Sequence, residues 1–442
     1  MKILKFSFEG FRGFKKRTTI NLNPDVNVFV GINGAGKSTI LDLIGGMLSY
    51  FISRVSSDRT YQNYFDEDDI NDESETFNSE VSVEFEEQTQ PLGWSVEYGE
   101  KRTTSGRLVP KNYDVSNTAL SQIRERVRRN KEYTLPVIAF YHAHRMMKGA
   151  KKAKTGRQAK DRVDILFEEA IKQEISSFES FESWFLSEKN YENQVRLKQE
   201  NSFRSRALEV VEEAIELFFN AMGSNRITYS HLDLFYDDSP EVTRWNAVKD
   251  PELSLKKNGK VIKLNKMSDG EKMVLVIVCD IARRLSIANP TERGRGILAG
   301  GGVVIIDEVE LHLHPAWQRN IISALTKVFP NIQFIFSTHS PQVLSGVKQR
   351  RTFGIVDYKV HEIPSLTKGR DSNSILWEIY AIPERPEEDK ANFSEFYTLL
   401  EEDRPDQKKI KELLQKLIKT YGDNDSKVLK AKLHFEMEFG VQ

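Results

Sequence analysis

The sequence predicts an α/β fold in which a mixed, largely parallel sheet is flanked by helices. A glycine-rich loop at 31–38 follows a short apolar strand-like segment and precedes a helical one. Two further short apolar runs, at 302–306 and 331–336, each end in polar residues, as buried strands of a parallel sheet do. A buried helix is expected at 272–285, before these two strands.

Composition sets the broad class of the protein. The 442 residues are 39% hydrophobic and 10% aromatic, enough to bury a sizeable core in two or three structural units. The longest apolar runs, at 274–279 and 303–306, are far shorter than the roughly 20 residues that cross a bilayer. No secretory apolar segment opens the chain, and the single cysteine, Cys279, excludes an internal disulfide framework. We therefore expect a cytoplasmic protein without a membrane partner.

The loop at 31–38 matches the phosphate-binding pattern G-x-x-x-x-G-K-[ST]. Its glycines let the backbone wrap closely, so that N–H groups and a helix N-terminus face a polyphosphate. Lys37 is expected to reach the β- and γ-phosphates, and the Ser38 hydroxyl to ligate Mg²⁺. The alternative is a glycine turn before an ordinary helix, which the full pattern and its flanks disfavour. The residues expected to contact the nucleotide here are Asn33, Gly34, Ala35, Gly36, Lys37, Ser38 and Thr39.

Two carboxylates follow the apolar run at 302–306. At the carboxyl end of a parallel strand, Asp307 can support the magnesium ion, and Glu308 can orient or polarise an attacking water. Paired acids can also simply begin a loop, but the phosphate loop upstream favours the catalytic interpretation.

His339 follows the run at 331–336 and is a second catalytic candidate. An imidazole at a strand tip can contact the γ-phosphate and report its loss. A lone histidine is more often structural, and only the position of His339 after a second strand favours the sensor role.

The segment Ser268, Asp269, Gly270 and Glu271 opens the helix expected at 272–285. Its Ser-x-x-Glu spacing is a capping box, which by itself would account for these residues. An exposed, glycine-containing helix N-terminus is also an anion site, so both interpretations can hold together.

The order of these motifs resembles the ABC-type ATPases of the SMC, RecF and Overcoming-Lysogeny-Defect kind. In that class the segment at 268–271 would be the signature, which contacts the nucleotide held by another copy. The resemblance therefore implies ATP and Mg²⁺ as cofactors and a homodimer or higher oligomer with shared ATP sites. Asp269 stands where transporters carry glycine, which argues against a transporter ATPase.

The resemblance extends to other segments. Residues 6–14 are similar to the opening motif of the family, in which the arginine, here Arg12, lies near the nucleotide. Residues 309–315 resemble the D-loop; the alternative is a metal site at His312 and His314, which lack a clear further ligand.

The expected lid element is not found. The strand-like segment at 135–145 occupies the usual Q-loop position but contains no glutamine. His142 and His144 are expected on one face of this strand, and Arg145 could contact phosphate or a partner; all three could equally be structural.

These anchors divide the chain into four regions. We expect an N-terminal ATPase lobe at 1–147, a basic loop with a helical insertion at 148–230, a C-terminal ATPase lobe at 231–365 and a helical region at 366–442. The first lobe should carry a β-rich arm around 80–98, and the acidic run at 66–75 should be a solvated loop. The basic segment at 148–162 is either a contact for DNA or RNA backbone or a solvated loop.

We expect no nuclease domain in the C-terminal region. It lacks the room and the acidic strand ends for a Toprim domain, and no HNH or zinc nuclease pattern is present. The layout resembles ATPases of anti-phage systems, especially the Septu ATPase, which also occurs beside some retrons. That resemblance implies nucleotide-dependent dimerisation that controls a partner HNH-type nuclease. The alternative is a RecF- or SMC-like ATPase of DNA maintenance without a defence role.

Overall fold

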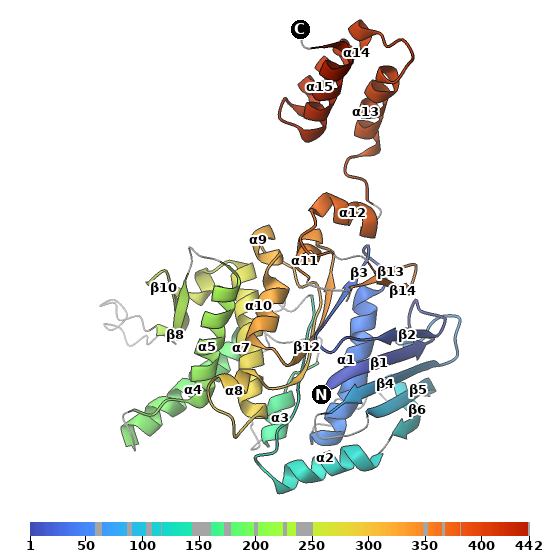
Figure 1. Cartoon of the computed structure of the whole chain (residues 1–442). Helices are drawn as coiled ribbons and strands as arrows, with labels where there is room; N and C mark the ends of the chain where they lie inside the picture. The colour runs from blue at the N-terminus through green and yellow to red at the C-terminus, as the bar shows by residue number, and fades with distance from the viewer. Residues whose placement is uncertain are drawn as a thin grey trace, which may run out of the picture. The chain divides into compact units, whose positions relative to one another are not determined.

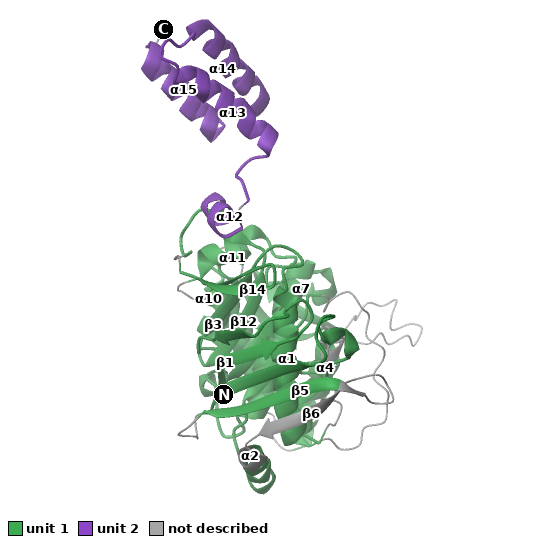
Figure 2. Cartoon of the chain, turned by 90° about the vertical axis from the view of Figure 1, so that its right-hand side faces the viewer, with its two compact units in different colours: residues 1–372 green, residues 373–442 purple. Residues whose placement is uncertain are grey.

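The computed structural model describes residues 1–57, 64–85, 91–102, 108–115, 117–143, 161–171, 178–198, 202–223, 228–235, 251–347, 352–364, 367–380 and 382–440. The chain forms two compact units, Met1–Ser372 and Asn373–Gln442, which Figure 2 shows in green and purple. The first unit contains the phosphate loop and all the other motifs predicted for a nucleotide site.

A six-stranded sheet organises the first unit, in the order β14-β13-β3-β12-β11-β7. Its strands are β3 (Val26–Val30), β7 (Val137–Tyr141), β11 (Gly302–Ile306), β12 (Ile332–Thr338), β13 (Thr352–Val356) and β14 (Lys359–Ile363). All neighbouring pairs are parallel except the one between β13 and the edge strand β14. The strands β7, β11 and β12 are buried at every position, as continuous apolar runs predict for a parallel sheet covered on both faces. The predicted α/β class is confirmed.

A five-stranded antiparallel sheet, in the order β2-β1-β4-β5-β6, forms the predicted β-rich arm. Its strands are β1 (Lys2–Glu9), β2 (Thr18–Asn21), β4 (Phe77–Glu84), β5 (Leu92–Arg102) and β6 (Leu108–Val115). In β4 every second residue is buried, because one face of this sheet packs on the core.

Helix α1 (Lys37–Val55) packs against both sheets, as Figure 1 shows in blue. The indole of Trp94 on β5 donates a hydrogen bond of 3.0 Å to the Met47 carbonyl of α1. Because sheets cover it on both sides, α1 is buried along most of its length, including the polar side chains of Lys37 and Asp42. The helix that follows the phosphate loop is therefore packed between the two sheets.

The insertion is helical, as predicted, with α3 (Arg162–Phe167), α4 (Phe178–Lys198) and α5 (Arg206–Ala221). Helix α5 packs on α7 (Asp269–Ala288), which in turn packs on β7. The first unit also contains the longer helix α2 (Asn117–Arg129). The remaining α-helices that the structure describes in this unit are short: α8 (Arg295–Leu298), α9 (Pro315–Gln318), α10 (Ile321–Val328) and α11 (Pro341–Gly346).

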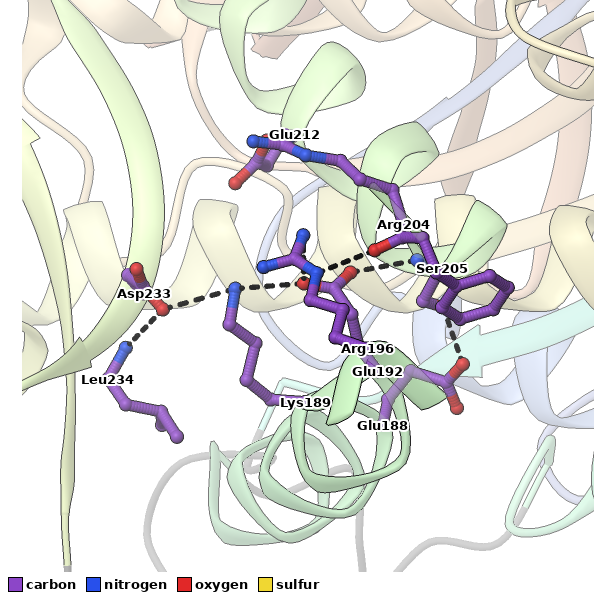
Figure 3. Close-up of polar contacts among 10 residues, drawn as sticks. Glu188, Lys189, Glu192, Arg196, Arg204, Ser205, Glu212, Asp233 and Leu234 are labelled. Carbon is purple, nitrogen blue, oxygen red and sulfur yellow. Dashed lines mark hydrogen bonds and ion pairs between the residues drawn. The ribbon is translucent and has the colours of Figure 1, made fainter. Parts of the chain in front are cut away.

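A third, small sheet was not predicted from the sequence. It contains β8 (Tyr229–Phe235), β9 (Glu252–Lys257) and β10 (Lys260–Lys263), paired antiparallel in the order β10-β9-β8. Figure 3 shows how α4 is joined to it: the buried carboxylate of Glu192 pairs with Lys189 at 3.4 Å, and Lys189 pairs with Asp233 of β8 at 3.3 Å. Glu192 also accepts a hydrogen bond of 2.8 Å from the Ser205 backbone N–H, just before α5.

The second unit confirms the helices predicted near the C-terminus. These are α13 (Glu387–Leu400), α14 (Gln407–Tyr421) and α15 (Ser426–Phe439), preceded by α12 (Ser372–Tyr380). They enclose a core that includes Phe396, Ile410 and Val428. Within the residues that the structure describes, no helix of the chain is both long and apolar enough to cross a membrane.

Candidate active site

The phosphate loop has the predicted context of strand, loop and helix. It leaves β3 after Val30 and enters α1 at Lys37, with Gly36 as the helix N-cap. Gly34 and Gly36 have φ angles of 79° and 104°, in the left-handed region that favours glycine. A Cβ atom on Gly36 would lie 2.8 Å from the Phe14 ring, so this position also has no room for a side chain. In the loop and the first turn of α1, Asn33, Gly34 and Ser38 are exposed, Thr39 is half-buried and Ala35 is buried.

Lys37 lies buried at the centre of a cluster of acids. Its ammonium group donates to the Gly31 carbonyl at 3.1 Å and to the Ile32 carbonyl at 3.0 Å. Burial lowers the pKa of Lys37, while the nearby carboxylates of Asp307, Glu308 and Glu310 act in the opposite direction. These carboxylates lie on the segment after β11, so the fold brings the two predicted motifs together.

Ser337 joins the two predicted acids. In the pairing of β11 with β12, Ile306 stands opposite Phe336, which places Asp307 beside Ser337. The Ser337 hydroxyl donates to Asp307 Oδ1 and accepts a hydrogen bond of 2.8 Å from the Glu308 backbone N–H. Glu308 has a φ of 47°, a conformation that non-glycine residues seldom adopt and that directs its half-buried side chain differently from a continuing strand.

His339 lies beside the phosphate loop. Burial lowers the pKa of its imidazole, the Lys37 charge acts in the same direction, and Asp307 and the Gly31 backbone oppose them. The His339 backbone N–H donates to Glu310 Oε1 at 2.6 Å, and burial raises the pKa of this glutamate. The neutral imidazole is therefore favoured next to the loop that would hold the γ-phosphate.

The donors at this sheet edge fit Mg²⁺. A carboxylate on Asp307 and a hydroxyl on the exposed Ser38 are hard oxygen ligands, and Mg²⁺ usually completes its shell with water and substrate phosphates. Asp307 would thus hold the ion from β11 and Ser38 from α1, as the sequence predicts.

Arg12 lies in a partly buried charge network with two carboxylates. Its guanidinium pairs with Asp42 of α1 at 2.8 Å and with Asp69 at 2.7 Å. Asp42 is one helical turn after Ser38, so this network borders the loop; contact between Arg12 and a nucleotide stays a prediction. Burial raises the pKa of Asp42 to about 6, although Arg12 opposes the shift.

Asp69 corrects one expectation. The acidic run at 66–75 was expected to be a solvated loop, but Glu67–Asp69 forms a 3₁₀ turn and Asp69 is only 5% exposed. Asp69 closes the turn by accepting from the Asp66 backbone N–H at 2.9 Å, and its charge faces Arg12.

The signature segment forms the capping box that its spacing predicts. Ser268 is the N-cap of α7. Its hydroxyl oxygen accepts a hydrogen bond of 3.4 Å from the Glu271 backbone N–H, and the Glu271 carboxylate accepts one of 3.1 Å from the Ser268 backbone N–H. Burial alone would raise the pKa of Glu271, but hydrogen bonds from Lys257, Tyr229 and Ser268 lower it to about 2. The small third sheet therefore fixes this helix start through Tyr229 on β8 and Lys257 on β9.

Gly270 packs against the D-loop segment. A Cβ atom at this position would lie 2.3 Å from the His312 carbonyl oxygen, so only glycine allows this approach. Ser268 and Asp269 are exposed, and no hydrogen bond or ion pair among the described residues joins the segment 268–271 to the phosphate loop of the same chain.

Two further histidines, His314 and His142, make local contacts in the described part of the chain. His314 is the N-cap of α9, and its Nδ1 accepts from the Ala316 N–H at 3.2 Å. His142 was expected within a strand together with His144, but β7 ends at Tyr141, and His142 Nδ1 lies 3.7 Å from Asp42. His144, Arg145 and the basic segment up to Lys160 lie outside the described residues.

Sequence reasoning missed two polar residues that organise the site. Ser337 could have been found by aligning the ends of two adjacent parallel strands, because it follows one strand as Asp307 follows the other. Glu310 falls within the segment at 309–315 that resembles a D-loop, and nothing in the local pattern indicates that its carboxylate receives the His339 backbone N–H.

Comparison with known proteins places this site in a family. Residues 26–345 match the family described as AAA domain, putative AbiEii toxin, Type IV TA system. The chain is 25% identical to the Retron Ec83 probable ATPase of Escherichia coli, with 99% of this chain and 87% of that protein covered. It is 27% identical to the Retron Vc95 probable ATPase of Vibrio cholerae serotype O1 biovar El Tor, with 81% and 74% covered.

Weaker similarities extend to other proteins. The Septu protein PtuA of Bacillus thuringiensis is 22% identical, with 83% of this chain and 80% of that protein covered. Among solved structures, an Smc head bound to the C-winged helix domain of ScpA aligns with a TM-score of 0.47 at 14% identity, covering 82% of this chain and 98% of that one.

The family match spans most of the first unit. It includes the phosphate loop, helix α7, the two acids that follow β11 and the histidine that follows β12. The predictions of an ATPase and of a resemblance to retron and Septu ATPases are thereby confirmed. The chain belongs to the AAA-domain family described as putative AbiEii toxin, Type IV TA system.

Proposed function

We propose that this protein binds ATP with Mg²⁺ on the loop at 31–38 and hydrolyses it in a site that two copies of the chain complete. The observation that carries the proposal is the convergence of Lys37, Asp307, Glu308 and His339 at one edge of the central sheet. Lysine, paired carboxylates and a histidine come here from three separate segments, and they can supply the phosphate clamp, the metal ligand and the water-orienting group that phosphoryl transfer uses.

Each group has a defined task in this proposal. Lys37 exchanges its two carbonyl contacts for the β- and γ-phosphates, and the N–H groups at the start of α1 face the same phosphates. Ser38 and Asp307 hold Mg²⁺, which neutralises the charge that develops on the phosphates. Glu308 orients the attacking water, and His339 contacts the γ-phosphate.

A second copy enters the proposal because no hydrogen bond or ion pair among the described residues joins the signature segment to the phosphate loop of its own chain. Ser268 and Asp269 are exposed at the N-terminus of a 20-residue helix, a position that attracts anions. Their lack of bonds to the loop of the same chain leaves them available to a nucleotide bound by a partner copy.

Mixing two inactive variants tests the shared site. Lys37→Ala should lose nucleotide binding, and Ser268→Arg should bind ATP but place a bulky cation against the partner's nucleotide and block association. Each variant alone should hydrolyse ATP at least about 100-fold more slowly than the wild type. An equimolar mixture should regain up to about half of the wild-type rate, because only mixed dimers can form and each has one intact site of two.

The matched control is Asp406→Arg, which changes the exposed N-cap of α14 in the C-terminal unit. This variant should keep full activity alone, and its equimolar mixture with Lys37→Ala should show about half of the wild-type rate, as simple dilution predicts. A mixture of the first two variants that stays inactive while both fold normally would contradict the shared site, and a fully active Ser268→Arg would contradict the role of the signature.

We further propose that the nucleotide-dependent dimer controls a separate HNH-type nuclease in anti-phage defence. The support is the similarity to ATPases of retrons and to the Septu protein PtuA. Such a system would operate in the cytoplasm, where ATP is available and phage nucleic acid enters.

Co-expression with the product of a neighbouring nuclease gene tests this role. We expect the two proteins to purify together, and phage plating to fall by at least about tenfold only when both are present with intact Lys37 and Glu308. Undiminished protection by Lys37→Ala and by Glu308→Gln would contradict control by nucleotide. Lack of a nuclease partner, combined with a DNA-repair defect on deletion, would favour the RecF- or SMC-like alternative.

A further inference from the structure

Three exposed apolar side chains border the phosphate loop, and the proposed hydrolysis site uses none of them. They are Ile32, 59% exposed, Val356, 54% exposed, and Tyr358, 42% exposed. Large apolar side chains at this level of exposure are ordinary when scattered, but a group beside a ligand site needs an explanation.

The strand pairing brings these residues together. In the parallel pairing of β3 with β13, Val30 stands opposite Gly354. The two chain segments stay close at the next residue pair, since a Cβ atom on Gly31 would lie 2.6 Å from the Ile355 carbonyl oxygen. Ile32 and Val356 therefore follow at the same edge of the sheet, and the turn to β14 begins there.

Tyr358 is held in a fixed position over the loop. Asp357 and Tyr358 have φ angles of 47° and 55°, which turns the chain back tightly into β14. A Cβ atom on Gly13 would lie 2.1 Å from the Tyr358 ring, and one on Gly36 would lie 3.1 Å from it. The ring also packs edge-on against Phe14, with centroids 5.3 Å apart and an interplanar angle of 84°.

The expected orientation of the bound polyphosphate places the base of the nucleotide near the Tyr358 ring. His339 follows β12, and the carboxylates near Lys37 follow β11, so the γ-phosphate belongs on this side of the loop. Strand β13 lies on the opposite side of β3 from β12. A nucleotide whose terminal phosphate faces Lys37 and His339 thus extends its ribose and base toward β13 and the turn at Tyr358.

We propose that Tyr358, with Ile32 at the same edge of the sheet, forms the platform on which the base of the bound nucleotide stacks. This inference rests on the proposed nucleotide site and adds the residues that recognise the nucleoside end. Stacking on an aromatic ring depends on the π-face of the base, so the platform favours purine over pyrimidine nucleotides.

Calorimetric titration with two probes separates this role from phosphate binding. Mg-ATP carries a base, and Mg-tripolyphosphate carries only the phosphates. Tyr358→Ala should weaken ATP binding about tenfold and change tripolyphosphate binding by less than about twofold. Tyr358→Phe, which keeps the ring, should bind ATP as the wild type does.

Tyr191 on α4 provides the matched control. It is 54% exposed and packs edge-on against a phenylalanine, Phe203, with ring centroids 6.0 Å apart. Tyr191→Ala should leave the binding of both probes unchanged. If Tyr358→Ala weakened the binding of both probes equally, the ring would serve only to pack the loop. If ATP binding were unchanged, the exposed apolar side chains would have a role other than contact with the base. Either result overturns the stacking proposal.

Lys37→Ala distinguishes a failure of the platform from a failure of the site. It should abolish binding of both probes, because both need the phosphate loop. Tripolyphosphate binding that survives Lys37→Ala would refute the nucleotide site itself. Loss of binding in Lys37→Ala together with unaltered ATP binding in Tyr358→Ala would refute only the platform.

Discussion

Glu308→Gln should abolish ATP hydrolysis while leaving ATP binding intact. Glutamine has almost the same shape, so the backbone hydrogen bond of residue 308 to Ser337 and the strained φ at this position can persist. The amide cannot act as a base or polarise water as the carboxylate does, and we expect the rate to fall at least about 100-fold. Phosphate release and ATP titration on the purified protein measure the two effects.

The same variant should reveal the dimer. If ATP joins two copies and hydrolysis separates them, Glu308→Gln should accumulate as an ATP-dependent dimer in sizing chromatography. Adding Ser268→Arg to it should restore the monomer. Glu362→Gln, an exposed change on β14, should behave as the wild type in both assays. Hydrolysis within about twofold of the wild type would show that Glu308 does not orient the water.

Asp280→Ala should cause the largest loss of stability that we predict. Asp280 lies fully inside the first unit, where its carboxylate pairs with Arg283 at 2.9 Å and Arg284 at 2.7 Å and accepts from the Tyr141 hydroxyl at 2.8 Å. Removing it leaves the guanidinium of Arg284, which is only 2% exposed, without this carboxylate. Breaking a buried pair in this way costs about 3–5 kcal/mol.

Urea unfolding of the full chain, followed by a probe in the first unit, measures this loss. Asp68→Ala is the matched control, because Asp68 is exposed in the same unit, and its change should stay within about 0.5 kcal/mol. A comparably small effect of Asp280→Ala would show that Arg284 finds other compensation in its hydrogen bonds to the carbonyls of Leu166 and Glu168.

The pH dependence of this contribution has a definite sign. Burial alone would raise the pKa of Asp280, but the two arginines and the Tyr141 hydroxyl lower it below its ordinary value. An acid whose folded pKa is depressed stabilises the fold above its unfolded pKa, and this contribution is lost as the pH falls toward the folded pKa. The stability difference between the wild type and Asp280→Asn should therefore be constant from pH 5 to 8 and should narrow below about pH 4.

Local patterns in the sequence were sufficient to predict the secondary-structure elements that form the candidate site. The phosphate loop, the capping box at 268–271 and the two apolar runs that end in polar residues each depend on neighbours within a few positions. Backbone conformation and helix capping are short-range, so the sequence predicts these elements and the class of protein. The helices of the C-terminal unit were predicted for the same reason.

Contacts between distant segments were decided only by the tertiary structure. Asp69 was expected in a solvated loop, yet it faces Arg12, which is 57 residues away in the sequence. Tyr229 and Lys257 fix Glu271 from a sheet that no local pattern predicted, and Glu310 holds the backbone of His339.

The motif order by itself determined that this chain is an ATPase with a phosphate loop, paired acids and a candidate sensor histidine. The tertiary structure decided which side chains support them, such as Ser337 between Asp307 and Glu308, and it brought Tyr358 over Gly13 and Gly36. The physical reason is that burial, ion pairing and strand register are set by packing between segments that lie far apart in the chain. A sequence motif contains only neighbouring residues and therefore does not indicate which distant side chains will contact it.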